Sequence, residues 1–156
     1  MYREKIETEL SEIVDLVKKD PKVDGKNIFA VGFSNGGFWA SYLAGTSRVS
    51  AGASHYGVWR ANFGREITNP YPLEYLTSKS SPILALHGGE DATQRIRHVE
   101  RAWSKVRANG AALKSHIYPA ADHAWDSKSK RFNAWNSKVT QDALERTMTF
   151  FRENMR

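Results

Sequence analysis

Hydrophobic and polar positions along the chain follow two periods, one typical of helices and one typical of buried strands. Within residues 3–19, apolar side chains recur every three or four positions among charged ones, which predicts an amphipathic helix that ends at Asp20-Pro21. Further helices are predicted from Asn35 to about Ala44, through Ile96, Val99, Trp103 and Val106 up to Asn109-Gly110, and over about residues 138–154.

Continuous apolar runs predict four strands, at residues 27–33, 49–57, 82–88 and 113–119. A segment rich in Asn, Pro and Tyr, from Trp59 to about Ser81, is predicted to be a loop. The alternation of helices with buried strands is typical of an α/β domain, here with a mainly parallel sheet of about four strands flanked by helices. Because no repeat or linker interrupts this pattern, we expect residues 1–156 to form a single domain.

The composition is that of a globular domain and excludes several kinds of site. Of the 156 residues, 40% are hydrophobic and 26% are charged. The chain contains no cysteine, which excludes disulfides, thiolate metal ligands and a cysteine nucleophile. No apolar stretch reaches the ~20 residues of a membrane span, and the polar N-terminus is unlike a secretory signal. We therefore expect a cytoplasmic protein with no membrane partner.

The net charge of +6 raises the question of an anionic partner. The basic residues form only short clusters, at Lys18-Lys19 and from Lys128 to Arg131, without interleaved aromatic side chains or a nucleic-acid-binding motif. We interpret the charge as a solvated basic surface and expect no nucleic-acid partner.

Functional residues of a parallel sheet gather beyond the carboxyl ends of its strands. The first predicted strand runs into Gly32-Phe33-Ser34-Asn35-Gly36, a Gly-x-Ser-x-Gly sequence between a strand and a helix. This context is typical of a nucleophile elbow, in which a sharp turn lifts the serine hydroxyl above the sheet. The alternative is a tight structural turn that contains a serine by chance. We predict that Ser34 is a nucleophile.

An acidic residue follows the third predicted strand, in the sequence "HGGEDATQ". Asp91 lies just past the glycines, where a triad acid would reach a histidine on the next loop. The spacing leaves the neighbouring Glu90 open as the acid. A structural alternative is that Asp91 caps the helix that carries Ile96.

A histidine follows the fourth predicted strand, in the sequence "PAADHAWD". Of the five histidines, His123 alone lies beyond the last strand, and we predict that it is the general base. The other four are assigned structural or surface positions: a packed His55, a His87 that supports the turn of the acid, and His98 and His116 at the surface.

The chain order Ser34, Asp91, His123 is the order of the α/β-hydrolase triad. In such a triad the histidine takes the proton of the serine, while the acid orients the imidazole and stabilises its charged form. Each residue alone is weak evidence, but the three after successive strands predict nucleophilic catalysis.

The segments "GFSNGG", "HGGED" and "YPAADHAWD" resemble the elbow, acid and histidine segments of the α/β-hydrolases, specifically of the dienelactone hydrolase-like branch. The similarity continues through "ASHYG" and "ALERTMTFFRENM", so it covers nearly the whole chain. The namesake enzymes of the branch carry cysteine at the position of Ser34. This difference favours a serine esterase over a lactonase that acts on dienelactone.

The resemblance also implies that the N-terminal half of the family's sheet precedes the part seen here and is missing from it, together with a loop that donates one oxyanion-hole amide. The backbone N–H of Asn35 would be the other oxyanion donor. In the family order the strand at 27–33 is central, so we expect it to be left as an apolar sheet edge. We therefore expect a homodimer or higher homo-oligomer that covers this edge.

The preferred interpretation is a serine carboxyl-ester hydrolase that forms an acyl-enzyme with small soluble esters and needs no metal or organic cofactor. Candidates for lining an apolar acyl pocket are Phe33, Trp59, Phe63, Tyr71 and Trp125. The alternative is a shortened hydrolase-like module that serves binding or interaction, with little or no catalysis.

Overall fold

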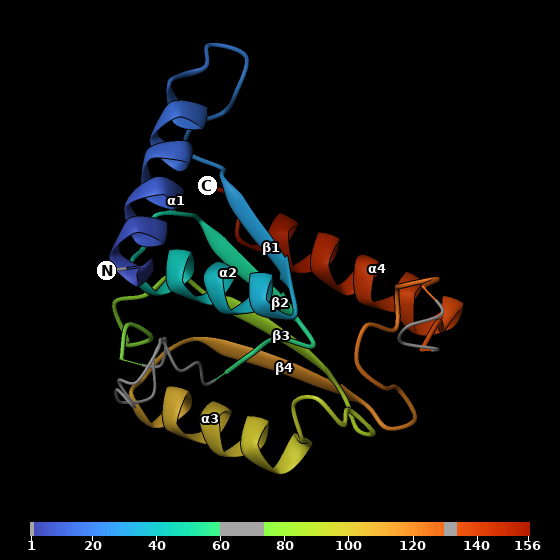
Figure 1. The fold of residues 1–156 in the computed structure, drawn as a ribbon. Coiled ribbons are helices and arrows are strands. Elements are labelled where there is room, and N and C mark those ends of the chain that lie inside the picture. Colours follow the sequence, from blue (N-terminus) through green and yellow to red (C-terminus); the bar gives the residue numbers. More distant parts are fainter. Residues whose placement is uncertain (1, 60–73, 130–133) are drawn as a thin grey trace.

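Helices and strands alternate along the chain in the computed structural model, which describes residues 2–59, 74–129 and 134–156 (Figure 1). The elements are α1 (Tyr2–Lys19), β1 (Phe29–Phe33), α2 (Asn35–Gly45), β2 (Ala51–His55), β3 (Ile83–Gly88), α3 (Ile96–Ala108), β4 (Leu113–Tyr118) and α4 (Ser137–Glu153).

The strands form one four-stranded sheet in the order β1-β2-β3-β4, and each neighbouring pair is parallel. The predicted α/β class with a parallel sheet is therefore confirmed. In the register of the sheet, Phe33 pairs with His55 and Gly88 pairs with Tyr118. The segments that follow the four strands consequently emerge along the same side of the sheet, where the sequence places its candidate residues.

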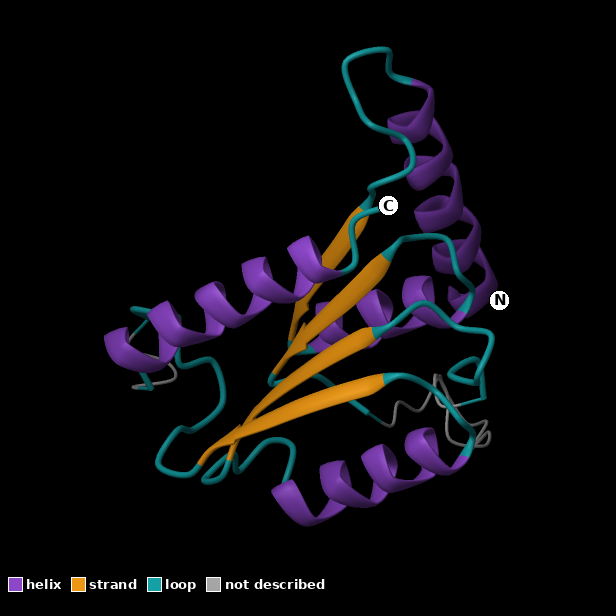
Figure 2. Cartoon of the chain, turned by 180° about the vertical axis from the view of Figure 1, so that it is seen from behind, coloured by secondary structure: helices purple, strands orange, loops and turns teal. Residues whose placement is uncertain are grey.

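Helices cover both faces of the sheet. One face packs against α4, whose Ala143 and Phe150 join a buried cluster with Ala53 and Leu86. The opposite face packs against α2 and α3, and α1 packs through Val14 against the α2 side of the molecule. Figure 2 shows α4 crossing one face of the strands, with α1 and α2 behind them. This layering buries the sheet and leaves the strand ends free for chemistry.

Local contacts set two element boundaries that differ from the predicted ones, the end of β2 and the start of α4. The second strand was predicted to extend to Gly57 but ends at His55, because Tyr56 adopts a left-handed φ of 37°. α4 begins at Ser137, since the side chain of Asn136 accepts a hydrogen bond from the N–H of Val139.

The two outer strands of the sheet differ in the polarity of their exposed side chains. β1 has the uncharged sequence FAVGF, with Val31 and Phe33 exposed to 47% and 44%. β4 exposes Lys114 and Ser115 instead. Polar and charged residues on an edge strand discourage pairing with other chains, so β1 lacks a protection that β4 has.

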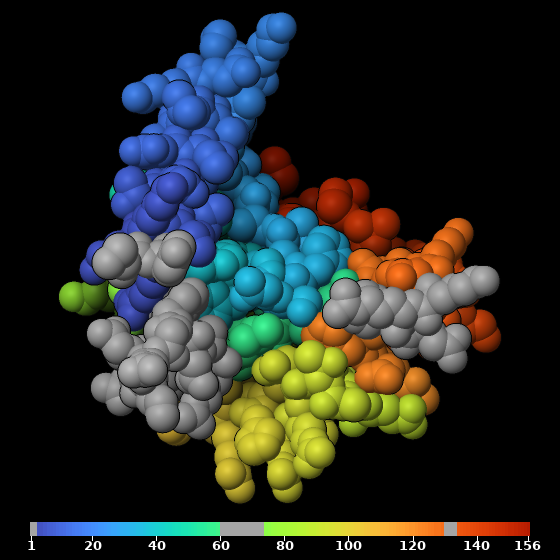
Figure 3. Space-filling model, in the orientation of Figure 1, coloured from blue at the N-terminus to red at the C-terminus, as the bar shows by residue number. Residues whose placement is uncertain are grey.

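The α1 helix extends beyond the sheet, as the dark blue column in the space-filling view shows (Figure 3). Its carboxyl-terminal half carries further exposed apolar side chains, namely Ile13, Leu16 and Val17. Both β1 and the carboxyl-terminal half of α1 therefore expose apolar side chains to solvent.

Candidate active site

Ser34 occupies a sharp turn between β1 and α2. Its backbone angles are φ 52° and ψ −115°, a left-handed conformation that costs energy for a residue with a Cβ. Three hydrogen bonds hold this turn: the N–H of Ser34 donates to the carbonyl of His55 at 3.0 Å, and the Ser34 carbonyl accepts from Gly37 at 3.0 Å and Val58 at 3.1 Å. The surrounding structure therefore fixes a strained serine above the sheet, as an elbow requires.

Gly32 makes this turn sterically possible. A Cβ at position 32 would lie 1.9 Å from the carbonyl oxygen of Gly36, so β1 and the first turn of α2 approach at backbone distance. By contrast, a Cβ at Gly36 would meet nothing within 4 Å. Of the two glycines in the Gly-x-Ser-x-Gly sequence, only the first is required by packing.

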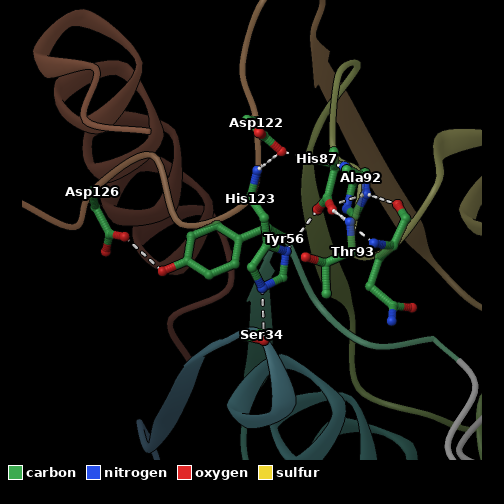
Figure 4. A network of polar contacts seen from close by, with 10 residues as sticks. Ser34, Tyr56, His87, Ala92, Thr93, Asp122, His123 and Asp126 are labelled. Carbon is green, nitrogen blue, oxygen red and sulfur yellow. Dashed lines mark hydrogen bonds and ion pairs between the residues drawn. The ribbon is translucent and has the colours of Figure 1, made fainter. Parts of the chain in front are cut away.

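Ser34, His123 and Asp91 form one chain of hydrogen bonds (Figure 4). The Nε2 atom of His123 lies 2.9 Å from Ser34 Oγ, and its Nδ1 atom lies 2.8 Å from Asp91 Oδ2. The imidazole and the carboxylate are buried, and Ser34 is half-buried. Of the two acids that spacing left open, Asp91 contacts the histidine, while Glu90 is exposed. The structure brings together the three residues that the sequence singled out.

Four donors surround the Asp91 carboxylate. Oδ1 accepts the N–H groups of Thr93 at 2.8 Å and Gln94 at 2.7 Å, while Oδ2 lies near His123 Nδ1 and 3.3 Å from His87 Nε2. Burial alone would raise the pKa of Asp91, but the hydrogen bonds from His123 and Gln94 outweigh it and hold the pKa below its usual value. The acid is thus ionised at neutral pH, as orientation of a histidine requires.

Asp91 is not the N-cap of the following helix, contrary to the structural alternative. α3 begins at Ile96, with Arg95 at the capping position. Asp91 instead closes the short turn before it through Oδ1, which leaves Oδ2 directed at His123. One carboxylate therefore stabilises its own loop and contacts the imidazole.

The loop that carries the acid is joined to the loop that carries the histidine. Asp122 Oδ1 accepts the N–H of His123 at 2.6 Å and that of Ala92 at 3.3 Å. In addition, the N–H of Glu90 donates to the carbonyl of Ala121 at 3.0 Å. The Asp91–His123 contact is therefore built on two loops that are bonded to each other.

Tyr56, which sequence reasoning left without a role, supports the histidine loop from the end of β2. Its hydroxyl donates to Asp126 Oδ1 at 2.6 Å, and its ring lies edge-on to His123 at 4.9 Å and to Trp125 at 4.7 Å (Figure 4). Burial and the Asp126 carboxylate raise the pKa of the Tyr56 phenol, which therefore stays protonated as a donor. The available signal was an Asp three positions beyond His123, because the sequence placed Tyr56 inside the predicted strand 49–57.

The remaining histidines occupy largely the positions expected of them. His55 is buried, with Nε2 2.8 Å from Thr147 Oγ1, and burial lowers its pKa to about 4. His87 contacts the turn of Asp91, His98 is exposed, and His116 is half-buried rather than fully at the surface.

An oxyanion donor is available at the start of α2. Asn35 is the first residue of that helix and directly follows Ser34. The N–H groups of a helix's first turn have no acceptor within the helix, and they carry its positive dipole end. The backbone N–H of Asn35 is therefore suited to stabilise negative charge that develops beside Ser34.

The five candidate pocket aromatics do not form one wall. Phe33 is exposed, and its ring lies 5.0 Å from that of His55, close to the elbow. Trp59 and Trp125 are instead buried in the core, where Trp59 packs on Trp103, so neither offers an open face to an acyl group. Phe63 and Tyr71 lie outside the described residues.

Three further observations concern the described ranges 2–59, 74–129 and 134–156. Within them, no group of three or more His, Asp or Glu side chains is placed to hold a metal ion. Every helix there is too short or too polar to cross a membrane. Two grooves of these ranges run between β4 and α4, lined by residues such as Lys114 and Phe150, and neither includes Ser34.

Comparison with known proteins gives one family match and partial relatives. The model of the dienelactone hydrolase family matches residues 1–155. The chain is 30% identical over 140 residues to dipeptidyl-peptidase 5 of Porphyromonas gingivalis, covering 70% of this chain and 20% of that protein. It is 26% identical over 148 residues to a "putative carboxymethylenebutenolidase" of Methylorubrum extorquens, covering 94% of this chain and 50% of that protein.

Solved structures share the fold. Esterase 2 of Thermogutta terrifontis, phosphoramylated by tabun, superposes with a TM-score of 0.76 at 18% identity over 93% of this chain and 62% of that chain. The described sheet therefore corresponds to part of an α/β-hydrolase fold, and the chain spans one half or less of these two curated relatives.

Proposed function

Because the chain belongs to the dienelactone hydrolase family, we propose that it hydrolyses small carboxylic esters with Ser34 as the nucleophile. The observation that carries this proposal is the unbroken hydrogen-bond chain from Ser34 Oγ through His123 to Asp91. A strained serine between β1 and α2 and an ionised buried acid support it, because an ordinary turn requires neither of them.

The proposed reaction follows from the contacts of His123. Its Nδ1 faces a carboxylate, so Nδ1 carries the proton and Nε2 presents a lone pair to Ser34 Oγ. His123 accepts the serine proton as Oγ attacks the ester carbonyl, and Asp91 stabilises the imidazolium that forms. The tetrahedral intermediate then expels the alcohol, which takes the proton from Nε2 and leaves an acyl-enzyme. Water repeats these steps and releases the acid.

Negative charge on the former carbonyl oxygen needs donors near Ser34. In the proposed mechanism the N–H of Asn35 is one such donor. Loss of a single donor from an oxyanion hole costs ~10²–10³ in rate. The turnover of this chain therefore depends strongly on a second donor.

The direct test compares wild type with Ser34→Ala in hydrolysis of p-nitrophenyl acetate and butyrate, and in labelling by a fluorophosphonate. Ser47→Ala is a matched control, since Ser47 is also left-handed, at φ 55°, but is exposed and outside the triad. We expect turnover and labelling in wild type and Ser47→Ala, and neither in Ser34→Ala. Absence of both in wild type would favour the binding-module alternative. Undiminished turnover in Ser34→Ala would contradict the mechanism.

We also propose that the β1 edge pairs with a second copy of the chain. The N–H of Ser34 and the carbonyl of Ile28 bond toward β2, so the backbone groups of the alternate residues Phe29, Val31 and Phe33 face away from the sheet. An antiparallel copy centred on Val31 would place Val31 opposite its equivalent and Phe29 opposite the partner's Phe33, so that the free backbone groups of the two strands face each other. The uncharged, exposed side chains of this edge support the pairing.

Sedimentation of wild type, Val31→Lys and Ser115→Lys tests the edge pairing. Both substitutions add a charge to an outer strand, but only Val31 lies on β1, whereas Ser115 is exposed on β4. We expect wild type and Ser115→Lys to sediment as dimers and Val31→Lys as a folded monomer. A stable wild-type monomer at micromolar concentration would contradict the proposal.

A further inference from the structure

His87 lies beside the acid of the proposed triad, near the same Asp91 oxygen that contacts His123. It lies near the end of β3, and its side chain is fully buried. Its Nε2 atom is 2.7 Å from the carbonyl oxygen of Gln94 and 3.3 Å from Asp91 Oδ2 (Figure 4). One ring nitrogen therefore faces both the acid and the end of the turn that carries it.

The contacts of His87 fix its tautomer. A carbonyl oxygen only accepts, so the 2.7 Å contact with Gln94 requires a proton on Nε2. Its Nδ1 atom is buried and has no hydrogen-bond partner within the described part of the chain. A second proton there would bury an unpaired charge, and burial accordingly lowers the pKa of His87. The ring is thus a neutral donor that bonds the Gln94 carbonyl and whose Nε2 lies 3.3 Å from Asp91 Oδ2.

The direction of this donor matters because Asp91 uses its two oxygens differently. Backbone N–H groups of the turn hold Oδ1, whereas Oδ2 is the oxygen that contacts His123. The Nε2 atom of His87 lies 3.3 Å from this same Oδ2. Its bond to Gln94 also closes the turn that supplies the two backbone donors.

We propose that His87 is a positioning residue of this site, which holds Asp91 Oδ2 in line with His123 Nδ1. The proposal rests on the proposed function. A neutral donor suits the task, because it fixes the carboxylate without cancelling the negative charge that stabilises the imidazolium of His123. His87 acts only through Asp91, since it touches neither Ser34 nor the reacting atoms.

Three variants separate the donor from the volume of the ring. His87→Gln places an amide N–H near the position of Nε2, His87→Asn carries the same amide too short to reach Asp91, and His87→Leu removes the donor. His98→Leu is the matched control, because His98 is exposed on α3. The measurements are kcat and KM for p-nitrophenyl acetate, the urea midpoint, and the NMR resonance of the His123 Nδ1 proton.

We expect His87→Leu and His87→Asn to lose about 10-fold or more in kcat, with KM within about two-fold, since misplacement of a catalytic group lowers the rate of the chemical step. The Nδ1 proton resonance should shift or broaden in both variants. His87→Gln should restore both readouts, and His98→Leu should match wild type.

Two outcomes would overturn the proposal. One is a folded His87→Leu or His87→Asn variant with kcat within two-fold of wild type and an unchanged Nδ1 proton resonance. The other is a His87→Gln variant as slow as His87→Asn at an equal urea midpoint. If wild type does not hydrolyse esters, the proposed function fails, but the proton resonance still tests whether His87 positions Asp91 against His123.

Discussion

Substitution of Gly32 by alanine is the sharpest test of how the backbone positions Ser34, the proposed nucleophile. The added Cβ would lie 1.9 Å from the Gly36 carbonyl oxygen, 2.2 Å from its carbon and 2.7 Å from the nitrogen of Gly37. All three are backbone atoms, which no side-chain rotation can move. Ordinary contact begins at about 3.4 Å, so the first turn of α2 must shift from β1 by roughly 1.5 Å.

The shift acts on both stability and chemistry, because Ser34 lies between the two segments that must separate. Overpacking of this kind costs about 3 kcal/mol of unfolding free energy. Displacement of Ser34 Oγ by an ångström or more breaks its 2.9 Å contact with His123, and such a misplacement costs about 100-fold in rate. Gly36→Ala meets no atom and lies in α2, so it should stabilise the protein by about 0.5–1 kcal/mol.

Urea denaturation and p-nitrophenyl acetate turnover of these two alanine variants give the comparison. We expect Gly32→Ala to unfold at lower urea and to lose most of its kcat, while Gly36→Ala keeps its turnover and unfolds at higher urea. If Gly32→Ala were as stable and as active as Gly36→Ala, the close approach of β1 and α2 would not hold the serine in place.

Three further predictions follow from the polar groups around the site. Burial lowers the pKa of His55 from about 6.5 to about 4, so between these pH values the unfolded chain binds a proton there that the native chain does not. The free energy of unfolding should therefore fall by about 3 kcal/mol as the pH is lowered from about 6.5 to about 4. Urea titrations at several pH values should show this loss in wild type and not in His55→Gln. Tyr56→Phe leaves Asp126 without its 2.6 Å donor and should lower the free energy of unfolding by about 1–3 kcal/mol and also lower kcat. An unchanged urea midpoint would contradict the role of this bond. Asp122→Ala removes the acceptor of the His123 N–H and should lower the free energy of unfolding, measured in urea, by about 1–2 kcal/mol. It should also lower kcat by a larger factor than it changes KM.

Most of the fold was predictable, because buried parallel strands and amphipathic helices have distinct periodicities. β3 and β4 were each placed to within one residue of their observed ends. The error at β2 has a local cause: the sequence through Tyr56 is as apolar as a strand, and its left-handed turn arises from contacts with β3 and the histidine loop. Such a turn depends on partners distant in sequence, so local pattern does not reveal it.

The candidate residues were predictable to the extent that each follows a strand. Ser34, Asp91 and His123 were found this way, and the contact of His87 with the turn of Asp91 was expected as well. The dual use of Asp91 was not, since spacing treated helix capping and histidine contact as alternatives. Burial of an aromatic side chain could not be read from the sequence: Trp125 lies two residues after His123, yet its indole is fully buried.

Hydrogen bonds join the loop that carries Asp91 to the loop that carries His123, whereas Ser34 follows a different strand, β1. Asp91 and His123 are carried by the inner strand β3 and its neighbour β4 and are fastened to each other through Asp122. Ser34 follows β1, at the other edge of the sheet, where its backbone bonds to His55 and Val58 and its Oγ lies 2.9 Å from His123 Nε2. A strand that pairs along β1 would act first on the segment that carries Ser34 rather than on Asp91 and His123, so in the proposed mechanism the rate of acylation would report the occupancy of that edge.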